Sequence, residues 1–307
     1  MQTRSIGSLT VSVVGIGCNN FGVRLDEART GEVVAAALDE GITLFDTADT
    51  YGGEHSEEFL GRALGSARDQ VVVATKFGMP VAAGAGAAPD YVRRACEASL
   101  RRLGTDRIDL YQLHAPDDGV PIADTLGALE ALRASGKVVE IGCSNFSAAQ
   151  LDEANAAAGD RARFRSVQNQ YSLLWREPER DGVLDCCERL ALAFLPYYPL
   201  ANGLLTGKMR PGEPPPSGTR LASMPEERRS HWLGESFTNR LADLLAFSEH
   251  HGISMLSLAF SWLLAHEPVA SVIAGASDPD QVRANAAAPR ELDEFVLDEL
   301  DELTGDD

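Results

Sequence analysis

Short β-rich runs alternate with longer amphipathic stretches along most of the chain. The β-rich runs cover residues 11–16, 42–45, 71–75, 108–113, 138–142, 166–170, 192–197 and 271–273. Each is followed by apolar residues at helical spacing, over residues 27–38, 56–64, 91–103, 122–134, 148–157, 183–190, 241–265 and 279–287. The pattern therefore predicts eight strand–helix units.

Repeated strand–helix units form a parallel sheet with right-handed crossovers. Eight of them in about 250 residues is the expected size of a closed (β/α)8 barrel, or TIM barrel. A doubly wound open sheet is the competing α/β architecture, because periodicity does not report whether a sheet closes. We expect residues 1–307 to form one barrel domain.

Three segments interrupt this alternation. Residues 5–10 have the pattern of a β-hairpin with Gly7 and Ser8 in its turn, and in a barrel such a hairpin would plug the bottom. Low-complexity sequence is limited to residues 81–88 and to residues 211–218, which hold four of the 15 prolines. Both are expected to be loops, and the second belongs to a long loop after strand seven that could act as a lid.

Composition narrows the function classes. A chain of 307 residues that is 44% hydrophobic can bury a large core. Its formal net charge of −19 leaves no general basic field for a nucleic acid or an anionic membrane surface. The chain shows neither the pattern of a signal peptide nor a run of 18 apolar residues, so we expect a cytoplasmic protein. The five cysteines lack C-x-x-C spacing, so neither a disulfide framework nor a metal site is expected: Cys18, Cys96, Cys143, Cys186 and Cys187.

Polar side chains follow several of the expected strands, at the barrel end where chemistry belongs. Taken singly, Asp46, Lys76 and His114 have ordinary interpretations as a turn cap, a solvated strand end and a loop histidine. Together with Tyr51 they suggest acid catalysis. A tyrosine has a pKa near 10, and a lysine held by a carboxylate would lower it by stabilising the phenolate. Tyr51 is therefore the candidate general acid, with His114 placed to orient a carbonyl oxygen.

In eight ordered motifs between residues 11 and 287 the chain resembles the aldo-keto reductases. The motifs are GITLFDTA at 41–48 with Tyr51 and Gly52 beyond, EEFLG at 57–61, ATK at 74–76, DLYQLH at 109–114, IGCSNF at 141–146, QNQY at 168–171, Pro199 and Leu200 with GLLTGK at 203–208, and GAS at 275–277 with Gln281 and Asn285. The resemblance implies a TIM barrel, a nicotinamide cofactor bound without a Rossmann domain, and a catalytic tetrad of Asp46, Tyr51, Lys76 and His114.

The same resemblance implies the cofactor contacts. Ser144, Asn145 and Gln168 would bind the carboxamide, and Tyr197 would stack on the nicotinamide ring. The remaining expected contacts are Gly17, Cys18, Asn19, Tyr198, Pro199, Leu200, Gly203, Leu204, Lys208, Arg220, Gly275, Ser277, Gln281 and Asn285. Residues 15–20 lack the third glycine of the dinucleotide fingerprint and are interpreted as strand-end backbone beside the nicotinamide.

The sequence gives conflicting signals on which nicotinamide cofactor is used. Many family members hold the 2′-phosphate of NADPH with a cation near Gln281, where this chain has none and Asp278 lies close by. The branch that resembles potassium-channel β subunits takes NADP through a lysine and an arginine after strand seven, which Lys208 and Arg220 match. We expect NADPH, with NADH as the alternative. Tyr198 departs from the family, in which a small serine is commoner.

Two other functions fit the sequence. One is a cofactor-binding regulatory or redox-sensing protein of the channel-β type, which would keep the barrel and the tetrad. The other is a metal-dependent hydrolase using Asp49, His55 and His114, whose atoms would have to converge at about 2 Å from one ion.

The expected substrate is a small carbonyl compound or alcohol, and the sequence leaves its identity, the reaction direction and the oligomeric state open. An apolar pocket mouth is expected from four aromatic residues: Phe21, Phe77, Trp175 and Trp232.

Overall fold

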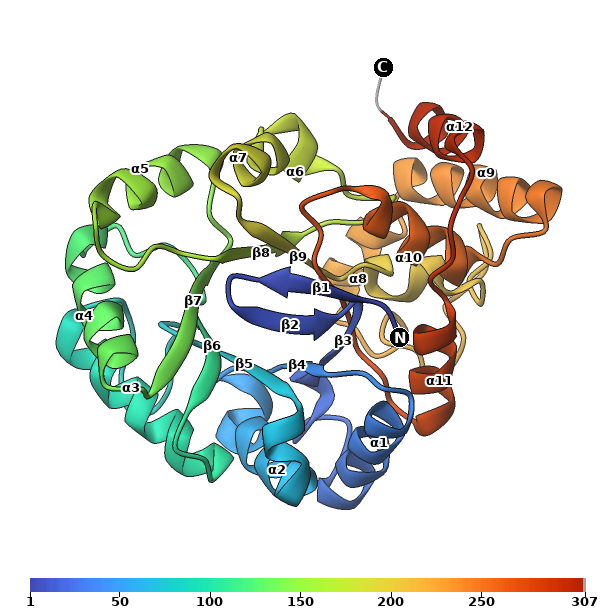
Figure 1. Ribbon diagram of the computed structural model, residues 1–307. Coiled ribbons are helices and arrows are strands. Elements are labelled where there is room, and N and C mark those ends of the chain that lie inside the picture. The colour runs from blue at the N-terminus through green and yellow to red at the C-terminus, as the bar shows by residue number, and fades with distance from the viewer. Residues whose placement is uncertain (306–307) are drawn as a thin grey trace.

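Eight parallel strands form one barrel in the computed structural model of the protein, which describes residues 1–305 (Figure 1). The strands are β3 (Val14–Gly17), β4 (Leu44–Asp46), β5 (Val72–Phe77), β6 (Ile108–Leu113), β7 (Val138–Ser144), β8 (Ser166–Gln170), β9 (Ala193–Tyr197) and β10 (Val272–Ala274). From β3 to β9 each strand pairs with the next, and β10 pairs with β3 on its other side, which leaves one gap between β9 and β10. Phe194 closes the remaining gap, because its N–H donates to Pro268 O (2.6 Å) and its carbonyl accepts from Ala270 N (3.0 Å). The TIM barrel is confirmed, and the open doubly wound sheet is excluded.

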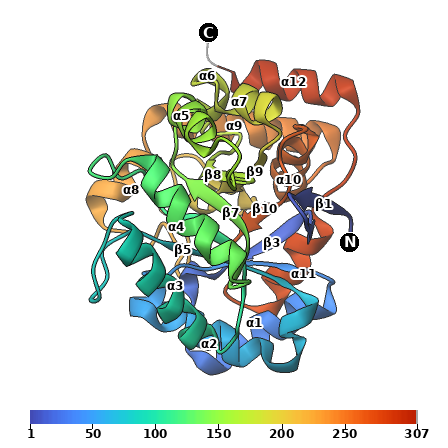
Figure 2. The ribbon, with the colours of Figure 1, turned by 60° about the vertical axis from the view of Figure 1, so that its left-hand side comes forward.

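Helices surround the strands on the outside of the barrel (Figure 2). Those that complete the eight units are α1 (Glu27–Asp39), α2 (His55–Leu64), α3 (Pro89–Leu103), α4 (Ile122–Ala134), α5 (Ala148–Ala158), α7 (Val183–Leu190), α10 (Met255–Ala265) and α11 (Pro279–Ala287). Additional helices are α6 (Glu177–Arg180), α8 (Glu226–Trp232), α9 (Glu235–His251) and α12 (Glu294–Thr304). Several begin at side-chain caps: Ser147 and Gln150 form a capping box on α5, and Asp278 caps α11. None of the helices within residues 1–305 is long and apolar enough to cross a membrane.

Two of the runs expected from the sequence are each divided between two elements in the structure. Residues 11–16 belong to two strands, because β2 (Leu9–Ser12) ends before Val13 and β3 begins after it. Residues 241–265 form two helices instead of one: Gly252, with φ 61°, ends α9 in the left-handed conformation. Ser254 then starts α10 by accepting from Ser257 N (3.1 Å).

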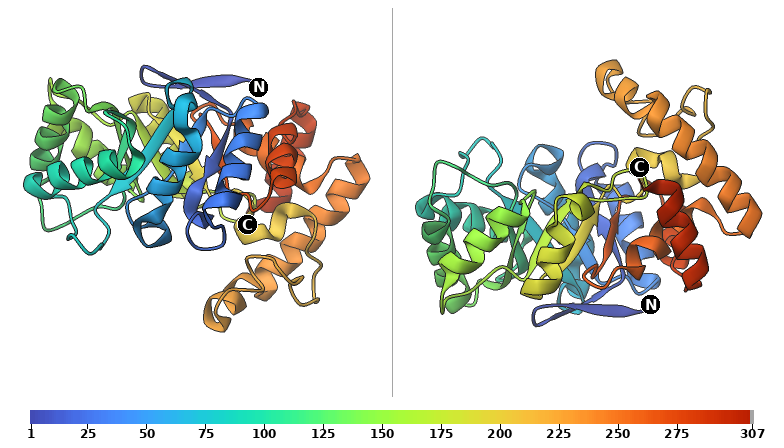
Figure 3. Two further views of the ribbon diagram at one scale, coloured as in Figure 1. Left: turned by 90° about the horizontal axis from the view of Figure 1, so that it is seen from below. Right: turned by 90° about the horizontal axis from the view of Figure 1, so that it is seen from above.

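A hairpin covers the amino-terminal end of the barrel strands. β1 (Thr3–Ile6) and β2 pair antiparallel around the turn at Gly7 and Ser8, as expected. In Figure 3 the hairpin lies at one end of the barrel and the segment around residues 225–251 projects beyond the other. Glu140 anchors the hairpin by accepting from Ser8 N (2.8 Å), and Arg4 donates to Leu264 O (2.6 Å). The far end of the barrel is therefore left for the site.

Inside the barrel, side chains lie in layers because every second residue of a strand points inward. The hairpin-side layer is apolar and includes Leu44, Ala74, Leu110 and Leu195, packed with Ile6 and Val11 of the hairpin. Two residues further along their strands, three of these positions become polar: Asp46, Lys76 and Gln112. The alternation that builds the core thus also aims these side chains into the barrel at its carboxyl end.

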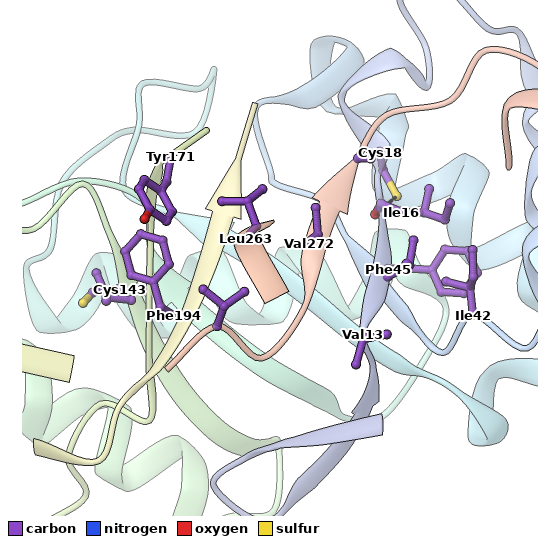
Figure 4. Close-up of a cluster of buried hydrophobic side chains, with 14 of the residues drawn as sticks. Val13, Ile16, Cys18, Ile42, Phe45, Cys143, Tyr171, Phe194, Leu263 and Val272 are labelled. Atoms are coloured by element: carbon purple, nitrogen blue, oxygen red, sulfur yellow. Dashed lines mark hydrogen bonds between the residues drawn. The ribbon is translucent and has the colours of Figure 1, made fainter. Parts of the chain in front are cut away.

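The larger apolar cluster lies between the strands and the helices. Figure 4 shows Phe45, Ile42 and Ile16 together on one side of the barrel, with Tyr171 and Phe194 on another. The five cysteines are all buried, and none forms a disulfide. Burial raises the pKa of the Cys143 thiol well above its ordinary value, so it behaves as a core side chain.

Candidate active site

A cavity of about 940 Å³ opens at the carboxyl end of the barrel. Its wall is built from the ends of β3, β4, β7, β8, β9 and β10, and from the long loop after β9. Asp46, Tyr51 and His114 line it, whereas Lys76 lies behind the wall and is buried. The structure therefore brings the four expected tetrad residues to one place.

Lys76 is the centre of the tetrad. Its Nζ donates to Asp46 Oδ2 (2.5 Å), to Thr47 O (3.1 Å) and to Tyr51 Oη (3.4 Å). The other oxygen of Asp46 accepts from Gln112 Nε2 (3.1 Å) and Gln168 Nε2 (2.9 Å). Burial disfavours the ammonium, but Asp46 and Tyr51 outweigh it, so the pKa of Lys76 lies above its ordinary value. Lys76 is therefore a fixed positive charge beside the phenol.

The pKa of Tyr51 is shifted in the opposite direction to the one expected from the sequence. Burial raises the pKa of Tyr51, and the lowering effect of Lys76 only partly opposes it. The expected net fall is therefore wrong for the protein as described. The phenol remains protonated near neutral pH, which is the state that a proton donor needs.

The loop that carries Tyr51 packs tightly against the loop after β3. Gly52, at φ 62°, lies so close that an added Cβ would stand 2.3 Å from Phe21 O. A side chain at this position would meet both the backbone strain and the contact. The glycine that follows Tyr51 thus permits the approach of the two loops.

His114 faces Tyr51 across the cavity wall. The two rings lie 5.9 Å apart and nearly perpendicular, at 80°. Burial, together with the charge of Lys76, lowers the pKa of His114 to about 3. The imidazole is therefore neutral at ordinary pH, and its Nδ1 has no hydrogen-bond partner among the described residues. A neutral ring of this kind can donate one hydrogen bond to an oxygen in the cavity.

The residues expected at the nicotinamide end also gather at the cavity. Ser144 Oγ donates to Gln168 O (2.6 Å), and Asn145 Oδ1 accepts from Tyr197 Oη (2.8 Å). Asn145 Nδ2 donates to His114 O (2.9 Å) and to Ser144 Oγ (3.1 Å). Gln168 belongs to both groups, because its amide nitrogen binds the tetrad carboxylate.

Most other expected cofactor residues line the cavity too. They are Gly17, Asn19, Tyr198, Pro199, Leu200, Gly203, Lys208, Arg220, Gly275, Ser277, Gln281 and Asn285. Two do not. Cys18 is buried, with Sγ directed at Ile16 O (3.7 Å), because the chain turns into a 3₁₀ helix at this residue. Leu204 is buried in the apolar cluster outside the barrel.

The expected aromatic pocket mouth is wrong. Phe21 and Phe77 are fully buried. Trp175 and Trp232 pack against each other, with ring centroids 6.3 Å apart, and neither lines the cavity. The aromatic lining consists of Tyr51, Tyr197 and Tyr198 with His114.

Arg24 is a cavity residue that the sequence analysis missed. Its Nη2 donates to Gly218 O (2.6 Å), which joins the loop after β3 to the long loop after β9. The sequence did hold a signal for Arg24 as a site residue: it is a basic residue that follows closely after a strand end in a strongly acidic chain. Other unanticipated lining residues include Asn20, Asn202, Thr206, Met209, Leu221 and Leu256.

The charge of the cavity wall favours an anion. Three cations line it, Arg24, Lys208 and Arg220, and among the described lining residues Asp46 is the one acid. Asp278 is not part of the wall. It caps α11 by accepting from Gln281 N (2.9 Å) and Gln281 Nε2 (2.7 Å), so both of its oxygens are engaged.

Asp49, His55 and His114 do not form a metal site. No group of three or more His, Cys, Asp and Glu side chains within residues 1–305 is arranged to hold a metal ion. His55 is exposed and pairs with Glu58 (3.3 Å). The arrangement gives no support to the hydrolase alternative.

Comparison with known proteins gives consistent matches over nearly the whole chain. The model of the aldo/keto reductase family matches residues 13–304. The uncharacterized oxidoreductase YrpG of Bacillus subtilis is 34% identical over 96% of this chain and 93% of its own length. The aldo-keto reductase YhdN of the same organism is 36% identical over 92% and 87%, respectively. The L-glyceraldehyde 3-phosphate reductase of Escherichia coli O157:H7 is 31% identical over 99% and 91%.

Proposed function

Because the chain belongs to the aldo/keto reductase family and is an oxidoreductase, we propose that it reduces an aldehyde or ketone to an alcohol, or catalyses the reverse, with NADPH and with Tyr51 as the general acid. The observation that carries the proposal is the phenol of Tyr51 at the cavity wall, with its oxygen 3.4 Å from Lys76 Nζ. The phenol has a proton to give, and the ammonium can stabilise the phenolate that remains.

The donors and unpaired atoms of the cavity fit a nicotinamide dinucleotide. Asn202 Oδ1 and His114 Nδ1 are buried there without partners among the described residues, so the wall offers unused polar positions. Ser144 and Asn145 would hold the carboxamide, and Tyr197 would hold the ring. When bound, the reduced nicotinamide supplies a hydride to the carbonyl carbon.

The residues of the chain supply the proton and the charge balance. His114, as a neutral imidazole, orients the carbonyl oxygen by a hydrogen bond. Tyr51 donates its proton to that oxygen as negative charge develops there. Lys76 stabilises the phenolate, and Asp46 keeps the ammonium in place with one oxygen while Gln112 and Gln168 hold the other.

Two positive charges on the loop after β9 support NADPH over NADH as the cofactor. The 2′-phosphate carries up to two negative charges near pH 7, and a protein of net charge −19 must meet it with local cations. Lys208 and Arg220 are available at the wall, and Asp278, which would repel the phosphate, is engaged as a helix cap. The positions of Lys208 and Arg220 support the proposal that the loop after β9 binds the 2′-phosphate.

The first test is turnover by the purified protein with NADPH and NADH against a panel of aldehydes and ketones. The panel should include small phosphorylated aldehydes, because one relative is named a glyceraldehyde 3-phosphate reductase. We expect NADPH oxidation that Tyr51→Phe abolishes without loss of NADPH binding. Tight NADPH binding with no turnover of any carbonyl would instead favour the regulatory, channel-β type of function.

A further inference from the structure

We propose that Tyr198 is a positioning residue that sets the preference for NADPH over NADH by holding Arg220 at the cavity wall. This inference rests on the proposed function, because it concerns the 2′-phosphate of that cofactor. Tyr198 comes directly after β9 and lines the same cavity as Arg220 on the long loop.

Tyr198 contacts Arg220 in two ways at once. Arg220 Nη2 donates to Tyr198 Oη (2.9 Å). The guanidinium carbon also lies 4.7 Å from the centroid of the tyrosine ring. The cation–π contact holds the guanidinium against the ring and the hydrogen bond directs its Nη2 at the hydroxyl, so one side chain restricts the position of the other.

The backbone around Tyr198 is shaped to make this contact. Tyr198 has φ 52°, in the left-handed region that a tyrosine seldom adopts. The turn is closed by Ala201 N, which donates to Tyr198 O (2.8 Å). Tyr197 and Tyr198 consequently present their rings at 86° to each other, so that Tyr197 reaches Asn145 while Tyr198 reaches Arg220.

The pairing leaves Arg220 able to bind an anion. Tyr198 is neutral, so it orients the guanidinium without cancelling its charge, as a carboxylate would. One of the five N–H donors of the guanidinium is used in the bond with Tyr198, and the others have no hydrogen-bond partner among residues 1–305, so they can bind a phosphate. An arginine that is already ordered loses less side-chain entropy when the phosphate binds.

Lys208 provides the internal comparison. It lines the same cavity, but its side chain is exposed and it makes no contact with Tyr198 among the described interactions. The proposal therefore predicts that Tyr198 is energetically coupled to Arg220 and not to Lys208.

A double-mutant cycle on cofactor binding tests this coupling. The dissociation constants of NADPH and NADH are measured by fluorescence quenching for the wild type and for Tyr198→Phe, Arg220→Ala and Lys208→Ala. Two double variants, which combine Tyr198→Phe with Arg220→Ala or with Lys208→Ala, complete the set. Adenosine 2′,5′-bisphosphate and 5′-AMP serve as probes that need no catalysis. Tyr198→Phe keeps the ring and removes the hydroxyl, and should weaken NADPH by about two- to tenfold, the range for one hydrogen bond.

We expect NADH and 5′-AMP to bind Tyr198→Phe as they bind the wild type. The effect of Tyr198→Phe on NADPH should disappear in the Arg220→Ala background and persist in the Lys208→Ala background. Equal weakening of NADPH and NADH, or an effect that persists in Arg220→Ala, would overturn the proposal and indicate a general structural role. Wild-type protein that binds both cofactors equally would overturn it too.

The binding cycle and the activity assay can fail independently, so failure of the Tyr198 proposal is distinguishable from failure of the proposed reductase activity. A protein that reduces no carbonyl but shows the coupling in the binding cycle would support the role of Tyr198 and contradict the assignment as a reductase.

Discussion

Asp49 gives a prediction about stability that can be worked out from its surroundings. The side chain is buried, and neither carboxylate oxygen has a hydrogen-bond partner among the described residues. Glu57, also buried, takes the available donors: Thr75 Oγ1 (2.6 Å) and Arg102 Nε (2.7 Å). Burial, and then the charge of Glu57, raises the pKa of Asp49 from 3.8 to about 7, although Arg102 opposes the shift.

The sign follows from proton binding. Between pH 3.8 and about 7 the folded state holds a proton on Asp49 that the unfolded state has lost. The free energy of unfolding therefore falls as pH rises through this window, and the contribution of Asp49 is constant on either side of it. Across the whole window, the contribution of Asp49 to the free energy of unfolding falls by about 4 kcal/mol, at about 1.36 kcal/mol for each pH unit.

Asp49→Asn keeps the shape and removes the ionisation, so it should abolish this part of the pH dependence. Urea unfolding of the wild type and the variant at about pH 5 and about pH 8 measures it. The free energy of unfolding of the variant, minus that of the wild type, should be about 3 kcal/mol larger (more positive) at the higher pH, so the variant gains relative stability there. Asp90→Asn is the matched control, because the Asp90 side chain is 83% exposed. Parallel pH profiles for the wild type and Asp49→Asn would refute the reasoning.

The tetrad and the hairpin give further tests. Tyr51→Phe should lower kcat at least about 100-fold and leave the NADPH dissociation constant nearly unchanged, as steady-state kinetics and titration would measure. Lys76→Met should remove most activity by withdrawing the charge that stabilises the phenolate, and an unchanged pH–rate profile would contradict this coupling. His114 has a pKa of about 3, so NMR should show no ring titration between about pH 5 and 8. Glu140→Ala should lower the free energy of unfolding by about 1–3 kcal/mol in urea titrations, because it removes the acceptor for Ser8 N in the hairpin turn, with little change in turnover.

The sequence was sufficient for the barrel and the tetrad because local pattern decides both. Alternation along each strand turns Asp46 and Lys76 inward, and the strand ends bring them to one end of the barrel. The ordered motifs then identify which polar strand ends belong together. Neither step depends on the detailed packing of loops.

Loop packing explains what the sequence left out. Cys18 turns into the core at the start of a 3₁₀ helix, and Arg24 reaches a loop 194 residues away. The direction of the Tyr51 pKa depends on a balance between burial and the charge of Lys76, which no spacing rule contains. The break between α9 and α10 was visible only as Gly252 within a continuous apolar pattern.

Closure of the barrel by its last strand has a consequence for how the chain is made. Val14 on β3 pairs with Val272 on β10, so the contact joins segments near opposite ends of the sequence. Until residues 268–274 leave the ribosome, β3 and β9 both present unpaired backbone edges, which can pair with the edges of other chains. A truncation before β10 should therefore yield aggregated protein, whereas removal of α12 leaves the barrel strands paired.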